Sequence, residues 1–299
     1  MVIDTNHYLA YNDWDFIISE EQRMRRIFVD SGSSIKKEEL EKYNCELIPL
    51  KILIGDKEYL DDGEDLPIDK FYDLLENEKH FPKTSLPSLD TVEKRVTEYT
   101  NNGDEVIIIT ISSKISGTNN SFNILFEDND KVLIIDSMCA VGGIRLIVDF
   151  INRHQDKSLK ELEKMVYDFI PHIQIMAIPE TLYYLQKGGR LSKTEWILGS
   201  ILQIKPTIGF KDGRVRVLAK NRGIKRAMKD VVEQLNNLEC DPDYDIIASY
   251  TFNKNNVLDL IEMTDEKYKK QIRVFDNLDP AIACHWGPNA FGFIFVSKK

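Results

Sequence analysis

The sequence of 299 residues lacks the segments that mark membrane-spanning, secreted and zinc-binding proteins. No apolar run approaches the roughly 20 residues needed to span a bilayer. The first residues contain neither the cationic n-region nor the apolar h-region of a secretory signal. The 4 cysteines are scattered without a C-x-x-C pair, which argues against a disulfide framework and a zinc site. We therefore expect a cytoplasmic protein with no transmembrane segment and no metal.

Motifs for nucleotide binding and nucleophilic catalysis are also missing. The sequence contains no G-x-x-x-x-G-K-[ST], G-x-G-x-x-G or G-x-S-x-G string. Its 5 histidines never pair at the spacing of metal ligands. These absences argue against a nucleotide site, a catalytic triad and a catalytic metal.

The charge is acidic overall and unevenly distributed. The chain has 39 Lys and Arg against 49 Asp and Glu, a net charge of −10. Residues 187–229 nevertheless hold 12 basic residues and only 2 acidic ones. This basic stretch is either ordinary solvated surface or a face that attracts an acidic or phosphorylated partner. The overall acidity disfavours nucleic acid as that partner.

The alternation of apolar strands with helices predicts an α/β protein. Residues 1–24 show no clear periodicity and are expected to form an extension. Residues 25–165 contain strands such as Val106–Ile109, whose consecutive β-branched residues suit a strand covered on both faces. We expect this part to be a three-layer α/β domain with a mainly parallel sheet.

Residues 166–299 show a different pattern. Two strand-like segments flank the turn at Asp212-Gly213, which is a typical hairpin signal. We expect an α+β domain with a mixed or antiparallel sheet. Three local expectations concern the first domain: a helix over residues 35–43, one strand over residues 45–54, and a polar loop containing Thr84 and Ser85.

Hydroxyl side chains follow several of the predicted strands. They form clusters at Ser31-Gly32-Ser33-Ser34, Ser112-Ser113, Ser116-Gly117-Thr118 and Ser137. The carboxyl ends of parallel strands meet at one edge of a sheet, where ligands collect, and a helix N-terminus there favours an anion. Helix capping and turn formation account for such strings equally well.

Two glycine-containing loops are further candidates. The run from Lys187 to Ser192 places Gly189 beside Arg190, which suits the binding of a carboxylate or phosphate. A helix C-terminus followed by a basic surface turn would show the same residues. The second loop carries His285 before Gly287 and could hydrogen-bond an anion.

These strings, in this order, resemble the DegV family of bacterial fatty-acid-binding proteins. The similarity covers about residues 26–297. The matching strings are Asp30-Ser31, Ile48-Pro49-Leu50, Thr84-Ser85-x-Pro87-Ser88, Ile111-Ser112-Ser113-x-Ile115-Ser116-Gly117-Thr118, Ile135-Asp136-Ser137, Leu182-x-Tyr184-Leu185-x-Lys187-Gly188-Gly189-Arg190-Leu191-Ser192, Ile204-Lys205-Pro206 and His285-x-Gly287-Pro288-x-Ala290.

The resemblance implies a long-chain fatty acid, such as palmitate or oleate, enclosed between two domains. By analogy, Thr84, Ser116 and His285 would bind its carboxylate. Some family members present the acid to a fatty acid kinase, and by analogy the basic 187–229 face would be the side shown to such a partner. Candidates for anion or partner contact are Ser85, Gly117, Thr118, Gly189 and Arg190. The chain departs from the family pattern at Asn119-Asn120, where an aromatic residue and Gln are common, and at Asn289, where a glycine is usual.

Two other functions fit the same residues. The chain could be a phosphoryl- or acyl-transfer enzyme using Ser116, His285 and Arg190, or a module that binds no ligand and acts only through its basic face. A fatty acid would draw its affinity from apolar walls. The candidates for those walls are Ile115, Ile197, Leu198, Ile201 and Phe293.

Overall fold

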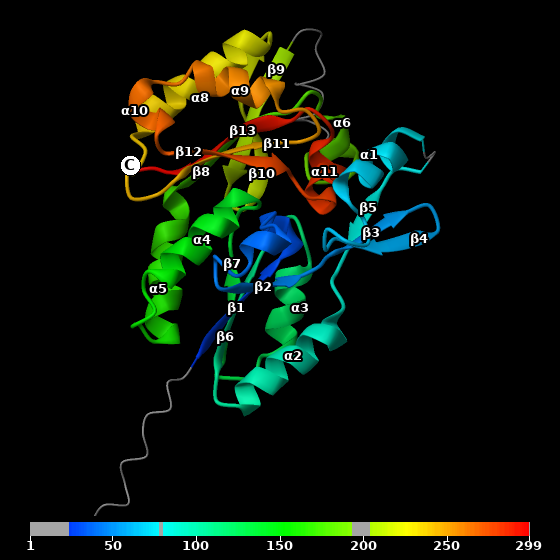
Figure 1. Ribbon diagram of the computed structural model, residues 1–299, viewed down its shortest axis with the longest axis vertical. Helices are drawn as coiled ribbons and strands as arrows, with labels where there is room; N and C mark the ends of the chain where they lie inside the picture. The colour runs from blue at the N-terminus through cyan, green and yellow to red at the C-terminus, as the bar shows by residue number, and fades with distance from the viewer. Residues whose placement is uncertain (1–23, 78–79, 193–203, 299) are drawn as a thin grey trace, which may run out of the picture.

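The computed structural model describes residues 24–77, 80–192 and 204–298 (Figure 1). A parallel sheet organises the first part of the chain. Its strands, in spatial order, are β2 (Cys45–Ile48), β1 (Arg25–Asp30), β6 (Glu105–Thr110) and β7 (Val132–Asp136). Successive residues of β6 enter different cores, since Ile107 packs toward α4 (Gly142–Asn152) and Ile108 packs with Phe122 on the opposite side.

Helices cover both faces of this parallel sheet. α2 (Leu89–Asn101) and α3 (Thr118–Leu125) lie on one side, while α4 and α5 (Leu159–Phe169) lie on the other. The predicted three-layer arrangement is therefore confirmed. α4 also contacts the second large sheet, so it is buried between the two sheets, as Figure 1 shows.

The second large sheet has six strands of mixed direction. In spatial order they are β10 (Arg214–Arg222), β9 (Ile204–Lys211), β8 (Ile173–Ile178), β13 (Phe291–Val296), β11 (Ile246–Tyr250) and β12 (Ile272–Asn277). α8 (Ile224–Leu238) and α9 (Asn255–Glu262) pack on its outer face. The β9–β10 hairpin turns at Asp212-Gly213, so the mixed sheet and this hairpin are confirmed.

A third, smaller sheet was not predicted. It consists of β4 (Lys57–Leu60), β3 (Lys51–Ile54) and β5 (Lys83–Ser85), and it packs with α1 (Ile68–Asn77) against α11 (Pro280–Trp286). The predicted strand over residues 45–54 is wrong, because the chain leaves the parallel sheet at Pro49 and enters this one. Proline cannot donate a ladder hydrogen bond, which favours a break at that position.

Two other local predictions are corrected. Thr84 and Ser85 lie in β5, not in a loop. Residues 35–43 form a short 3-10 turn, η2 (Lys37–Glu39), because Glu39 is held by the buried Arg145 of α4 with Nη1···Oε1 at 2.7 Å. The remaining short helices are η1 (Ser31–Ser33), η3 (Ile170–His172), α6 (Tyr183–Lys187) and α10 (Glu266–Lys269).

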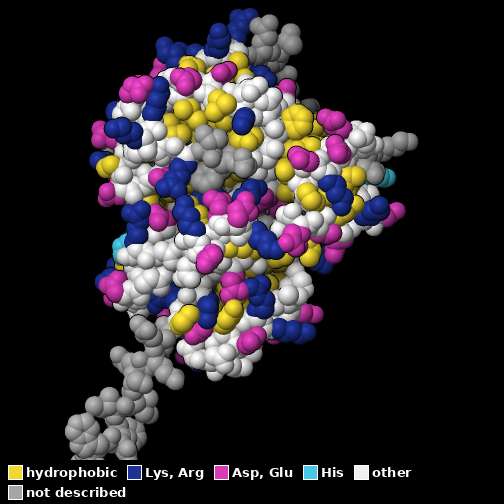
Figure 2. All heavy atoms as spheres, in the orientation of Figure 1, with side chains coloured by type: hydrophobic (Ala, Val, Ile, Leu, Met, Phe, Trp, Pro, Cys, Tyr) yellow, Lys and Arg dark blue, Asp and Glu magenta, His cyan; other side chains and the backbone are white. Residues whose placement is uncertain are grey.

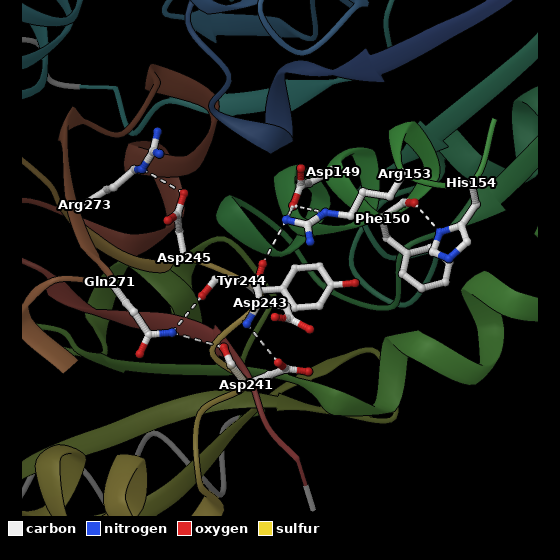
Figure 3. A network of polar contacts seen from close by, with 10 residues as sticks. All are labelled: Asp149, Phe150, Arg153, His154, Asp241, Asp243, Tyr244, Asp245, Gln271 and Arg273. Atoms are coloured by element: carbon white, nitrogen blue, oxygen red, sulfur yellow. Dashed lines mark hydrogen bonds and ion pairs between the residues drawn. The ribbon is translucent and has the colours of Figure 1, made fainter. Parts of the chain in front are cut away.

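A polar and aromatic network joins α4 to the segment before β11, as Figure 3 shows. The Arg153 side chain donates to Asp149 at 2.7 Å and to the Asp243 carbonyl at 2.9 Å. Its guanidinium lies 4.6 Å from the centre of the Tyr244 ring. Arg273 pairs with Asp245 nearby. The network links the first half of the chain to the mixed sheet. The division into domains at residue 165 stays a prediction.

Candidate functional site

A cavity of about 350 Å³ lies where the three sheets approach one another. Its walls come from the carboxyl end of the parallel sheet, the small sheet, α6, α11 and the β9–β10 hairpin. Such a volume falls in the range of small-molecule sites. The polar residues lining it are Thr84, Ser85, Ser116, Gly117, Arg190 and His285.

The structure brings together six of the eight predicted site residues. The other two lie beside the cavity and do not line it. Thr118 is buried and its hydroxyl lies 2.9 Å from that of Ser116. Gly189 follows α6 with a φ of +77°, a left-handed conformation that suits glycine.

The centre of the polar wall is the contact between Thr84 and His285. The Thr84 Oγ1 atom lies 2.9 Å from the Nε2 atom of His285. β5 holds Thr84 opposite Ile52, while His285 is in the last turn of α11. Burial, aided by the positive charge of Arg190, lowers the pKa of His285 to about 3. The imidazole is therefore neutral at pH 7, with one ring nitrogen able to donate.

The other imidazole nitrogen is enclosed. The Nδ1 atom of His285 is buried and has no hydrogen-bond partner among the described residues. It faces Gly188 so closely that a Cβ atom at that position would lie 2.3 Å away. The absence of a side chain at Gly188 therefore lets α11 approach the end of α6.

Ser116 lies at the start of α3. The Ser116 hydroxyl accepts a hydrogen bond from the Thr118 amide at 3.3 Å, and Gly117 is the residue that caps the helix. The sequence forms this turn because the Ser116 amide donates to the Ser112 carbonyl at 3.1 Å. Free amides at a helix start carry partial positive charge, so a carboxylate here would be stabilised.

Arg190 supplies the positive charge at the cavity. Its Nε atom donates to the Ile115 carbonyl at 3.0 Å, and its Nη1 atom donates to the Gly188 carbonyl at 2.5 Å. Burial lowers the pKa of Arg190, but a guanidinium stays protonated in proteins. The side chain thus connects the segment after α6 to the loop that carries Ser116.

The remaining hydroxyl clusters serve the backbone and do not line the cavity. Ser31 accepts from the Leu50 amide at 3.1 Å, Ser112 donates to the Gly213 carbonyl at 2.8 Å, and Ser137 donates to the Cys139 carbonyl at 3.1 Å. For these serines the interpretation as turn and capping residues is the correct one. The Ser112 bond also anchors the tip of the β9–β10 hairpin.

Most of the cavity wall is apolar. Of the predicted wall residues, Ile115 lines this cavity, while Phe293 lies in the core beneath α8 and α9. Ile197, Leu198 and Ile201 lie outside the described residues. The apolar wall residues that were not predicted are Leu50, Leu86, Ile111, Ala140, Leu185, Phe210, Val215, Ala281, Ile282 and Trp286.

The two departures from the family pattern lie outside the cavity lining. Asn119 is buried and donates to the Thr110 hydroxyl at 3.0 Å. Asn289 has a φ of +59° and donates to the Glu180 carboxylate at 2.6 Å. Asparagine tolerates the left-handed region better than most residues, which explains how it replaces a glycine there.

Within residues 24–77, 80–192 and 204–298, no helix is both long and apolar enough to cross a bilayer. In the same part of the chain, no group of three His, Cys, Asp or Glu side chains is arranged to hold a metal ion.

Comparison with known proteins places the fold and the family. The model of the family described as "Uncharacterised protein, DegV family" matches residues 24–298. A fatty acid-binding protein of Thermotoga maritima is 28% identical over 278 residues, covering 90% of this chain and 96% of that protein.

Two solved structures have the same fold. The fatty acid binding DegV family protein of Streptococcus agalactiae has a TM-score of 0.82 at 24% identity, covering 93% of this chain and 100% of that one. The Streptococcus pneumoniae Fatty Acid Kinase B3 protein, loaded with linoleic acid, has a TM-score of 0.76 at 21% identity, covering 92% and 100%. The chain belongs to the DegV family.

Proposed function

We propose that this protein binds one long-chain fatty acid, such as palmitate or oleate, in the cavity beside Thr84, Ser116 and His285. The observation that carries the proposal is the composition of the cavity wall. Hydroxyl groups, a neutral imidazole and one guanidinium gather in a wall that is otherwise apolar. A molecule with one anionic end and a long apolar remainder matches this distribution.

The polar groups can bind a carboxylate in its ionised form. Burying a carboxylate is costly unless hydrogen bonds compensate for the lost water. If the His285 Nε2–H donates to Thr84, the Thr84 hydroxyl hydrogen is free to donate to the ligand. The Ser116 hydroxyl, the start of α3 and the charge of Arg190 complete the set. Ser85 and Gly117 border the same space.

The apolar wall would supply most of the affinity. Each buried methylene contributes about 0.8 kcal/mol, so about 15 methylenes offer on the order of 10 kcal/mol before ordering costs. A hydrogen-bonded carboxylate fixes the orientation, while the tail sets how tightly the acid is held.

Relatives support this choice of ligand. The Thermotoga maritima relative is named a fatty acid-binding protein, and the Streptococcus pneumoniae structure contains linoleic acid. The cavity of this chain has a wall whose chemistry suits the same class of molecule, which supports the proposal.

We further propose that the basic 187–229 face, of which residues 193–203 lie outside the described part of the chain, presents the bound acid to a fatty acid kinase. β10 is at the edge of the mixed sheet, and its alternate residues Arg214 and Arg216 are exposed while Val215 between them lines the cavity. Lys225 and Arg226 at the start of α8 are also exposed. One hairpin thus connects the ligand to a cationic edge that would attract an acidic or nucleotide-bearing partner. The opposite signs of charge are interspersed over the face drawn in Figure 2.

The geometry gives the enzyme alternative less support. A nucleophilic serine needs a base within hydrogen-bond reach. Among the described residues, the Ser116 hydroxyl contacts Thr118, and His285 contacts Thr84. We therefore propose a carrier that leaves the chemistry to its partner. The reading as an empty module is at odds with a cavity of about 350 Å³.

Calorimetric titration of the delipidated protein with palmitate and oleate tests the ligand. We expect one site per chain with a negative heat-capacity change, the mark of apolar burial. Absence of binding to either acid would overturn the proposal. Turnover of a phosphoryl or acyl donor by the purified protein alone would favour the enzyme alternative.

A further inference from the structure

A second and much smaller cavity, of about 20 Å³, adjoins the first. Its wall is formed mainly by the inner face of the mixed sheet, including Ile175, Ala177 and Ile294. The wall is almost wholly apolar, so an empty space here stays dry and offers nothing to a polar ligand.

One residue is common to the walls of the two cavities. Trp286 lines both of them. The neighbouring backbone gives the same placement independently, since Ala140 lines the first cavity and Val141 lines the second. Because they share Trp286 and are lined by successive residues of the chain, the two spaces lie close together, with Trp286 in the partition between them.

The indole is held firmly in this place. Trp286 is the last residue of α11 and is only 6% exposed. Gly287 follows with a φ of +71°, and a Cβ atom on it would lie 2.2 Å from the Tyr184 ring. The backbone after the tryptophan therefore packs closely against that ring, and the end of α11 lies against α6.

We propose that Trp286 is the residue that limits the length of the acyl chain. This inference rests on the proposed function: if the cavity holds a fatty acid, the indole stops the tail at the partition, and the second cavity is the unused space beyond it. Each additional buried methylene tightens binding about fourfold, so a fixed stop produces a sharp decline in affinity for longer acids.

The test replaces the partition by a small residue. Trp286→Ala joins the two cavities and adds the volume of the indole. The delipidated wild type and variant are titrated with saturated acids from dodecanoate to tetracosanoate. We expect the chain length of tightest binding to increase by several carbons, while the shortest acids bind more weakly because their contact with the indole is lost.

Two further variants, Ala177→Val alone and Ala177→Val combined with Trp286→Ala, test whether the longer acyl chains extend into the second cavity. Ala177→Val narrows that cavity alone, and valine suits its strand position. Alone it leaves the optimum length unchanged, and combined with Trp286→Ala it brings the optimum back toward that of the wild type. Trp286→Phe makes a smaller opening and serves if the alanine variant does not fold, as judged by circular dichroism.

The outcomes are distinct. A folded Trp286→Ala or Trp286→Phe protein with the wild-type length optimum overturns the role of Trp286 and leaves the proposed function standing. A wild type that binds none of the acids overturns the proposed function, and this inference with it.

Discussion

The Nε2 atom of His285 lies 2.9 Å from the Oγ1 atom of Thr84, although the two residues are 201 positions apart in the chain. Thr84 lies in β5 of the small sheet, and His285 lies in α11. If the imidazole donates in this contact, the threonine hydroxyl can donate to a ligand in the largely apolar cavity that both residues line.

Removing the Thr84 hydroxyl should weaken fatty acid binding without unfolding the protein. Thr84→Val keeps the shape of the side chain in β5 but removes its donor. A hydrogen bond to a charged group contributes about 1.5–3 kcal/mol, so the Kd for oleate should increase about 10- to 100-fold. Thr91→Val, on the exposed surface of α2, is the matched control and should bind oleate like the wild type. An unchanged Kd in Thr84→Val would remove this residue from the site.

Ser116 should contribute to the same carboxylate. Ser116→Ala removes the hydroxyl but keeps the start of α3, whose free amides remain. We expect a smaller increase in Kd than for Thr84→Val, because the helix terminus still favours the anion. In the double variant the changes in binding free energy should not be additive, since both hydroxyl groups bind the same carboxylate. A double variant that binds oleate as tightly as the wild type would contradict both assignments.

His285 should make the stability of the ligand-free protein depend on pH. Its pKa is about 3 in the folded protein and about 6.5 in the unfolded chain, so below pH 6.5 the unfolded state binds the proton more readily. Stability from this residue is therefore lost as the pH falls. Between pH 7 and pH 4 the loss is about 3 kcal/mol, on the order expected from these two pKa values.

Urea unfolding of the wild type and His285→Gln at several pH values measures this contribution. Glutamine keeps a donor near the Thr84 hydroxyl but does not titrate. The wild type should lose more stability than the variant over the same pH interval. Parallel pH profiles for the two proteins would show that the imidazole is not desolvated as described.

Charge reversal on the basic 187–229 face should slow the reaction with the partner kinase and leave the affinity for the fatty acid unchanged. Lys225→Glu changes an exposed residue of α8, and Lys160→Glu makes the same change on the exposed side of α5. With a fatty acid kinase, the first should lower the rate of acyl phosphate formation about tenfold at low salt, and the second should not. Both should bind oleate normally. Equal rates for the two variants would exclude this face.

The ion pair between Glu39 and Arg145 should matter for stability. The Arg145 guanidinium is only 4% exposed and contacts both Glu39 carboxylate oxygens, at 2.7 and 3.0 Å. Glu39→Gln leaves a buried charge poorly paired and should cost about 3 kcal/mol in the free energy of unfolding. Glu64→Gln, which breaks the exposed pair with Lys37, should leave the unfolding midpoint unchanged. An equal loss of unfolding free energy in Glu39→Gln and Glu64→Gln would contradict the assignment of a larger contribution to the buried pair.

The two large sheets could be predicted because their strands carry strong local patterns. The run Val106–Ile109 is buried on both faces, as its β-branched residues indicate, and the Asp212-Gly213 turn forms the predicted hairpin. Local patterns failed where a tertiary contact decides the structure. Residues 35–43 have a helical pattern, yet the pairing of Glu39 with Arg145 holds them in a short turn.

The site could be predicted only in part. Thr84, Ser116, Arg190 and His285 could be predicted from hydroxyl clusters, glycine-containing loops and family strings together, and the structure places them around one cavity. The wall residue Trp286 could not be identified, because nothing in its local sequence shows that it adjoins two cavities. Such a relationship depends on the packing of α11 against the mixed sheet, which no periodicity encodes.

The most direct test of the central claim is mass spectrometry of the lipid that accompanies the protein. Wild type and the Thr84→Val/Ser116→Ala variant would be purified from bacteria without added lipid, denatured and extracted. We expect about one long-chain fatty acid per wild-type chain and much less in the variant. Wild-type protein that contains no fatty acid, and takes up none on incubation with oleate, would contradict it.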